Sequence, residues 1–224
     1  MPTAWMKENC GDGAGMTINL RRDTIKPEKT VFLAGEGSNE LGGWAKDPIY
    51  RDDIPEVGII EKLLWKIKTD GWKVTGAKRW KDIKKFRAGE HRSAEERNVL
   101  GVCLDARENG QNVIAFSRDS DGDREREANV QKGIESAKTL WSDRLGIIGG
   151  CAIPCIEGWV LAIAGIKDTE SSSRTKIETR IIELGIKPKN TADLVAKIEE
   201  CGINNIVADA CSLKSWLESA RITL

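Results

Sequence analysis

The chain has 224 residues, and its 35 Lys and Arg balance its 35 Asp and Glu, so the formal net charge is zero. Hydrophobic residues make up 40%, which is enough to bury one large domain with a smaller appendage. The balanced charge argues against a protein that holds nucleic acid through a general basic excess. No apolar run reaches the roughly 18 residues of a membrane span, and the N-terminal residues lack a signal-peptide layout. We therefore expect a cytoplasmic protein with no membrane partner.

Strands and helices alternate along the chain from residue 29 onward. Short apolar runs ended by glycines or acids predict strands, and apolar residues at helical spacing predict helices. This order predicts an α/β fold with a mainly parallel sheet of about four strands and helices on both faces. The predicted strands are 29–34, 71–77, 112–117 and 145–153, and the predicted helices are 55–68, 93–108, 124–143 and 156–162.

Two further segments flank the expected catalytic domain at 29–166. Residues 1–28 are polar and Gly-rich, then basic, which suggests an arm or hairpin. Residues 167–224 are expected to form a small helical region that begins with a Ser-rich linker or mobile loop at 167–175. Its apolar residues offer a partner-docking surface or pack on the sheet; they are Ile203, Ile206, Leu213, Trp216 and Leu217.

Two acidic clusters follow two of the predicted strands. Glu36 and Glu40 come after the first strand, and Asp119, Asp121 and Asp123 come after the third. The carboxyl edge of an open α/β sheet is where ligands bind. Crowded carboxylates raise each other's pKa unless a cation neutralises them, and Mg²⁺ or Mn²⁺ suits oxygen ligands. The alternative for the second cluster is an Asp-rich turn that caps a helix.

Three familiar loop motifs do not fit these clusters. The first lacks the third glycine of a dinucleotide fingerprint, because Leu41 stands in its place, and no P-loop lysine follows. The second lacks the Glu expected at the twelfth position of an EF-hand, where Val130 stands.

The densest basic stretch, residues 78–87, contains two aromatic residues, Trp80 and Phe86. Such a stretch forms either a solvated surface or a phosphate-contacting surface beside an aromatic stacking platform. The candidate substrate-binding residues are Lys78, Arg79, Lys81 and, from the second acidic cluster, Arg118.

Taken together, the acidic clusters resemble the motifs of the Toprim domain of topoisomerases, bacterial primases and OLD-family nucleases. The strand-Glu-Gly-x-x-Glu pattern of Glu36 and Glu40 is similar to the first Toprim motif, and Asp119-Ser120-Asp121 is similar to its D-x-D. Residues 151–162, CAIPCIEGWVLA, resemble a P-x-x-E-x-W-L-L-A segment of stand-alone, OLD-like Toprim proteins linked to phage defence. The resemblance covers about residues 29–165; residues 1–28 and 170–224 match no part of it.

The resemblance implies a nuclease that uses Mg²⁺ or Mn²⁺ to hydrolyse phosphodiester bonds in DNA or RNA. It implies that Glu36, Asp119 and Asp121 are catalytic metal ligands, with Glu36 alternatively the general base. Asp123 and Glu40 would be further acids of the metal site, and Glu157 could face the same edge.

The resemblance also implies partners, because stand-alone Toprim proteins often work beside an ATPase. The expected role is the effector of a phage-defence system, controlled by an ATPase partner and with a possible oligomeric form. Two alternatives stay open. One is a catalytically degenerate Toprim-like binding subunit, and the other is a small-molecule phosphohydrolase, a class that usually carries its D-x-D at the first strand.

Overall fold

The computed structural model describes residues 28–45, 56–88, 91–141, 143–187 and 189–224. The arm or hairpin predicted for residues 1–28 therefore lies outside the described residues, apart from residue 28. Within the described ranges, no helix is both long enough and apolar enough to cross a bilayer.

Four parallel strands form one sheet in the order β2–β1–β3–β4. They are β1 (Lys29–Gly35), β2 (Trp72–Arg79), β3 (Val113–Asp119) and β4 (Gly146–Ala152). Successive side chains of a strand point to opposite faces, so Leu33 and Ala115 enter one core while Phe32 and Phe116 enter the other. The parallel sheet that the alternating order predicted is confirmed.

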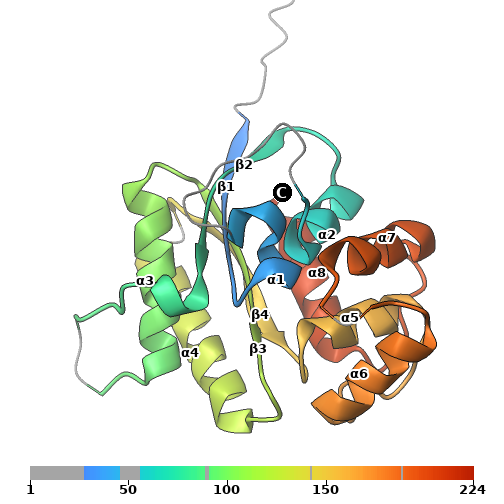
Figure 1. Cartoon of the computed structure of the whole chain (residues 1–224). Coiled ribbons are helices and arrows are strands. Elements are labelled where there is room, and N and C mark those ends of the chain that lie inside the picture. The colour runs from blue at the N-terminus through green and yellow to red at the C-terminus, as the bar shows by residue number, and fades with distance from the viewer. Residues whose placement is uncertain (1–27, 46–55, 89–90, 142, 188) are drawn as a thin grey trace, which may run out of the picture.

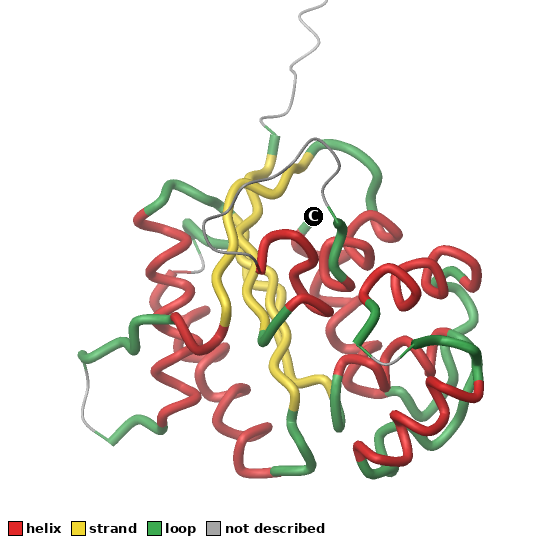
Figure 2. Tube along the Cα trace, in the orientation of Figure 1, coloured by secondary structure: helices red, strands yellow, loops and turns green. Residues whose placement is uncertain are grey.

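Helices cover both faces of this sheet, as Figure 1 shows, and Figure 2 shows the strands as the layer between them. On one face lie α3 (Ala94–Glu108) and α4 (Arg124–Trp141). On the other lie α2 (Ile59–Ile67), α5 (Ile156–Ile163), α6 (Arg174–Glu183), α7 (Thr191–Cys201) and α8 (Cys211–Thr223). The short elements are α1 (Ser38–Leu41), η1 (Gly42–Ala45) and η2 (Trp80–Asp82).

The C-terminal helices share their core with the sheet. Trp216 of α8 is 1% exposed, and its Nε1 donates a hydrogen bond to the Phe116 carbonyl oxygen of β3 at 2.9 Å. Leu213 and Leu217 are also buried. Ile203 is buried in the same core at 8% exposure, so four of the five candidate docking residues pack inside the chain. Of the two alternatives for these residues, packing inside the chain therefore describes these four.

The Ser-rich segment before α6 is a structured turn, which corrects the expected linker or mobile loop. Thr169 and Ser172 are buried. The Ser172 amide donates to the Thr169 carbonyl oxygen at 3.1 Å, and Glu170 accepts a hydrogen bond from the Ser212 amide at 2.6 Å. The turn is thereby tied to the start of α8, and it fixes where α6 begins.

Candidate functional site

The ends of β1 and β3 bring the two acidic clusters together. The two strands are neighbours, with Ala34 opposite Phe116, and Asp119 is the last residue of β3. The Asp119 amide donates a hydrogen bond to Glu36 Oε1 at 3.1 Å. The expectation that these acids meet at the carboxyl edge of adjacent parallel strands therefore holds for Glu36 and Asp119.

Glu40 is brought to the same edge by α1, a helix that the sequence reading did not predict. The Gly37 amide donates to Glu40 Oε2 at 2.8 Å, which holds the carboxylate over the start of the turn. The helix can fold back on β1 because residue 35 is glycine. A Cβ there would lie 2.4 Å from Glu40 Cβ, well inside any normal contact.

The start of α5 supplies the fourth acid. The Ile156 amide donates to Asp119 Oδ1 at 2.9 Å, so the helix start sits on the end of β3. Glu157 accepts a hydrogen bond from Asn39 Nδ2 at 2.7 Å, and Asn39 accepts one from Thr191 Oγ1 of α7 at 3.0 Å. The other oxygen of Glu157, Oε2, is buried without a hydrogen-bond partner.

These four acids, Glu36, Glu40, Asp119 and Glu157, form what we call the carboxylate cluster. Burial raises the pKa of Asp119 to about 8, and the charges of Glu40, Glu36 and Glu157 add to the effect. Burial also raises the pKa of Glu40 to about 7, where hydrogen bonds from backbone amides oppose the increase. Near neutral pH, Asp119 and Glu40 therefore tend to keep their protons, and a bound cation would favour their ionised forms.

Two arginines partly neutralise the cluster. Arg118 Nη1 forms an ion pair with Glu36, and Arg118 Nη2 lies 3.1 Å from Glu95 Oε1. Arg174, the first residue of α6, places Nη1 3.4 Å from Asp119 Oδ2 and 2.5 Å from Asp121 Oδ1. Sequence reasoning missed Arg174 because it follows the Ser-rich stretch read as a linker. Ser173, which caps α6, was the signal that a helix begins there.

The other two predicted acids do not join the cluster. Asp121 lies on the turn after β3, its side chain is 39% exposed, and Arg126 and Arg174 bind it at 2.6 and 2.5 Å. Hydrogen bonds from these arginines outweigh desolvation and lower its pKa. Asp123 Oδ1 accepts hydrogen bonds from the amides of Glu125 and Arg126 at 2.9 and 3.1 Å, so it caps α4. This corrects the placement of Asp123 as a metal ligand, because the helix-capping alternative describes it.

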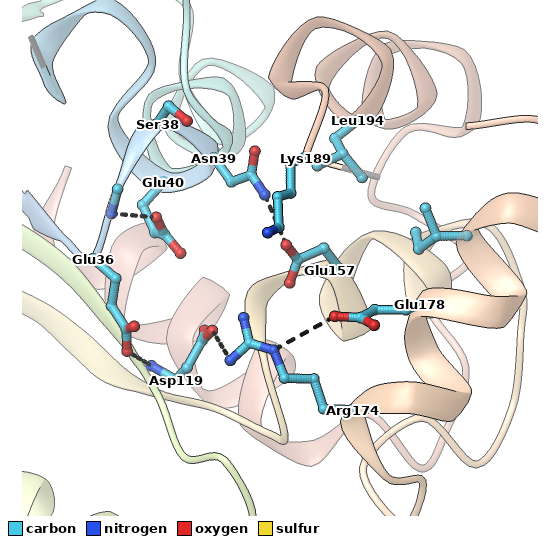
Figure 3. A pocket seen from close by; sticks show the side chains of 12 residues that line it. Glu36, Ser38, Asn39, Glu40, Asp119, Glu157, Arg174, Glu178, Lys189 and Leu194 are labelled. Atoms are coloured by element: carbon cyan, nitrogen blue, oxygen red, sulfur yellow. Dashed lines mark hydrogen bonds and ion pairs between the residues drawn. The ribbon is translucent and has the colours of Figure 1, made fainter. Parts of the chain in front are cut away.

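A pocket of about 400 Å³ opens between the carboxylate cluster and the C-terminal helices. In Figure 3 the acids of the sheet edge lie opposite Arg174 and Glu178 of α6 and Lys189, which precedes α7. Ile181 and Leu194 complete that wall. The C-terminal region thus forms part of the candidate site, although the motifs that predicted the site end before it.

The basic stretch divides into paired and unpaired residues. Lys78 and Arg79 do not reach the site, because they form ion pairs with Asp105 at 2.5 Å and Asp82 at 2.6 Å. Lys81 instead lines a second cavity, of about 460 Å³, together with Arg118 and Glu36.

The two aromatic residues of the basic stretch pack against the protein, which gives little support to the alternative of an aromatic stacking platform. Trp80 is 6% exposed, and its Nε1 donates to Glu95 at 2.9 Å. Phe86 packs edge-on against Trp141. Trp80 is therefore largely buried against the α3–α4 face, and Phe86 is partly buried there.

The donor set of the cluster fits a hard divalent cation. All four groups offer carboxylate oxygens, and the buried, unpartnered Oε2 of Glu157 has the character of a vacant ligand atom. Within the described ranges, no three His, Cys, Asp or Glu side chains are already spaced as a metal site. A bound ion would therefore require the acids to close by side-chain rotation, with Glu36 leaving Arg118 and Asp119 leaving Arg174.

Comparison with known proteins returned no significant match to a family model, a curated protein or a solved structure.

Proposed function

We propose that this chain is a divalent-metal-dependent nuclease of the Toprim type that hydrolyses phosphodiester bonds in DNA or RNA. The observation that carries the proposal is the convergence of Glu36, Asp119 and Glu157 at the ends of β1 and β3 and the start of α5. Glu40 joins them from α1, and Asp119 and Glu40 have pKa values of about 8 and 7. Crowded oxygen ligands at the carboxyl edge of a parallel sheet suit Mg²⁺ or Mn²⁺ and an anionic substrate.

Each site residue has a role that follows from its place. Glu36, Asp119 and Glu157 would hold the metal, and Asp121 would act from the rim if it exchanged its arginine partners for the ion. A bound divalent cation would supply charge stabilisation at the phosphoryl oxygens and at an attacking water. Glu40 has a pKa of about 7, which suits a group that accepts a proton from water at neutral pH. Arg174, which is 46% exposed, can hydrogen-bond a phosphate oxygen beside the acids.

The direct test is a hydrolysis assay on the purified chain with DNA, RNA and the small diester bis(p-nitrophenyl) phosphate. We expect cleavage with Mg²⁺ or Mn²⁺, less with Ca²⁺ and none with EDTA. Asp119→Asn and Glu36→Gln should each lower kcat/KM on the order of 100-fold or more. Wild-type rates in variants purified in parallel would identify a contaminating nuclease and contradict the assignment.

A degenerate binding subunit is the second candidate, and the two arginine pairs favour it. Arg118 pairs with Glu36, and Arg174 lies near Asp119. In a site that never binds metal, these arginines would neutralise the acids permanently. In that case added Mn²⁺ would neither bind nor change the melting temperature. A functional metal site instead gains stability of about 2.7 kcal/mol at a metal concentration 100 times Kd.

Control by an ATPase partner in phage defence remains part of the proposal, supported by the resemblance and by the zero net charge. Low charge implies weak, salt-sensitive binding of nucleic acid by the chain alone. The test is co-purification and nuclease assay with and without the product of the neighbouring gene. Full activity of the isolated chain at physiological salt, with no co-purifying protein, would remove the partner from the proposal and leave the nuclease.

A further inference from the structure

The cavity on the α3 side of the sheet edge is a candidate binding surface. It has a volume of about 460 Å³ and opens beside η2 and the end of β3. We call it the basic groove. The lining residues that matter for binding are Trp80, Lys81, Lys85, Asn98, Arg118 and Glu36.

Two lysines supply the unpaired positive charge of the basic groove. Lys81, Lys85 and Arg118 are the cations of its lining, but Arg118 is paired with Glu36 and Glu95. Lys81 and Lys85 are exposed, and neither forms an ion pair with another described residue. Lys78 and Arg79, by contrast, are taken up by Asp105 and Asp82. Two lysines of the basic stretch that form no ion pair with another described residue, Lys81 and Lys85, therefore line the same cavity.

The side chain of Arg118 is held in place at the groove by its neighbours. Its guanidinium lies 5.8 Å from the centre of the Trp80 ring, and Nη2 lies 3.1 Å from Glu95 Oε1. Trp80 Nε1 donates to the same Glu95 side chain at 2.9 Å. Arg118 is thus held between the aromatic ring and the carboxylates of Glu95 and Glu36. The phosphate contacts in the groove therefore fall to its two lysines, Lys81 and Lys85.

Glu36 connects the two cavities, because it lines both the basic groove and the pocket of the carboxylate cluster. A ligand that fills both must cross the end of β1 at Glu36. Its phosphates would meet lysines on one side and the acids on the other. A free mononucleotide has no phosphodiester, whereas a polynucleotide has one between every pair of nucleotides and can place one phosphate in each cavity.

We propose that the basic groove binds the phosphate backbone of a polynucleotide on one side of the scissile bond, with Lys81 and Lys85 as its phosphate contacts. This rests on the proposed function, and it deepens that function by requiring a chain with several phosphates. It therefore separates a nuclease from a small-molecule phosphohydrolase. Such contacts are independent of base sequence and weaken as salt displaces the lysines from the phosphates.

The test compares two double variants that each remove two positive charges from the same stretch. Lys81→Ala/Lys85→Ala changes the groove, and Lys84→Ala/Arg87→Ala changes exposed residues outside its lining. Binding of a fluorescein-labelled single-stranded oligonucleotide is measured by anisotropy in Ca²⁺ at several salt concentrations. Folding of each variant is verified by circular dichroism.

We expect the groove variant to bind at least about tenfold more weakly, with the salt slope reduced by about 1.4 for two lost phosphate contacts. The control variant should stay close to wild type. In Mn²⁺, the ratio of kcat/KM for the oligonucleotide to kcat/KM for bis(p-nitrophenyl) phosphate should fall about tenfold in the groove variant alone. Equal weakening in both variants, or none in the groove variant, would overturn the inference. Failure of wild type to hydrolyse either substrate would count against the proposed function, while the anisotropy result still decides the groove.

Discussion

Burial and crowding at the sheet edge set the charge of the individual carboxyl groups. Asp119 ionises near 3.8 when solvated, and its pKa rises to about 8 here because it is buried beside Glu40, Glu36 and Glu157. Asp121, two residues further on, is half exposed between two arginines, and its pKa falls. Asp119 and Asp121 therefore differ in pKa although they belong to one motif. Only Asp119, whose pKa is raised, needs a cation to stabilise its ionised form.

We predict that the metal-free protein loses stability as pH rises from about 5 to about 8. Over this interval Asp119 and Glu40 keep protons in the folded state, with pKa values of about 8 and 7, that they release in the unfolded chain. The folded state binds more protons, so raising pH favours unfolding. Urea unfolding in EDTA measures the slope. The Asp119→Asn variant keeps an oxygen that can accept the hydrogen bond from the Ile156 amide. It should make the free energy of unfolding depend less on pH. An unchanged dependence would contradict the raised pKa of Asp119.

Arg174 leads to a second prediction, because it lies where a divalent cation would be attracted. Removing its charge in Arg174→Gln should tighten Mn²⁺ binding about five- to tenfold, a value reduced by the exposure of the side chain. Isothermal titration calorimetry measures Kd. Arg180→Gln is the matched control, because Arg180 lies on the same helix and donates to the Lys167 carbonyl oxygen. Equal Kd values in all three proteins would show that Arg174 does not compete with the metal.

Among the elements, α1 most limits what the sequence could predict. All four strands follow from apolar runs, and capping by Ser93 fits its predicted place at the start of α3. The helix α1 has only four residues and no apolar periodicity, so Glu40 reads as part of a glycine-rich loop. Arg174 is separated from Asp119 by three structural elements, α4, β4 and α5, and only tertiary packing brings the two residues together. The pairing of Lys78 also depends on Asp105, which lies outside the basic stretch.

The tight contact of α1 with β1 gives a prediction for Gly35→Ala. The new Cβ would lie 2.4 Å from Glu40 Cβ, so α1 must move, at a cost of about 1–3 kcal/mol. Metal affinity should fall with stability because Glu36, which lies between Gly35 and α1, would shift with the helix. Gly37→Ala is the control for stability, since the nearest atom to its Cβ would be 3.9 Å away. Urea unfolding of both variants distinguishes a steric effect from a general cost of replacing glycine; equal losses would reject the steric explanation.

On the scale of the whole molecule, the C-terminal helices are structural partners of the site. One hydrophobic core joins β1, β3, α2 and the helices from α5 to α8. Asn39 links Thr191 of α7 to Glu157 at the sheet edge. The boundary expected after residue 166 therefore separates two regions of sequence, while the packing around the pocket is continuous across it.

This shared core predicts a large effect of Trp216→Ala. The substitution removes a buried ring and leaves the Phe116 carbonyl oxygen without its donor, so we expect a loss of about 3–5 kcal/mol. Unfolding should remain one transition by circular dichroism and by fluorescence. Ile222→Ala on the same helix, at 78% exposure, should change stability by less than about 0.5 kcal/mol. Separate transitions for the sheet and the C-terminal helices would contradict a continuous core.

Binding of a divalent metal by the carboxylate cluster is tested most directly by anomalous diffraction from crystals soaked in Mn²⁺. We predict a Mn²⁺ peak about 2.1–2.3 Å from carboxylate oxygens of Glu36, Asp119 and Glu157, with Arg118 and Arg174 turned away from Glu36 and Asp119. A crystal with no peak at this edge, and with both arginine ion pairs intact at saturating Mn²⁺, would contradict the account.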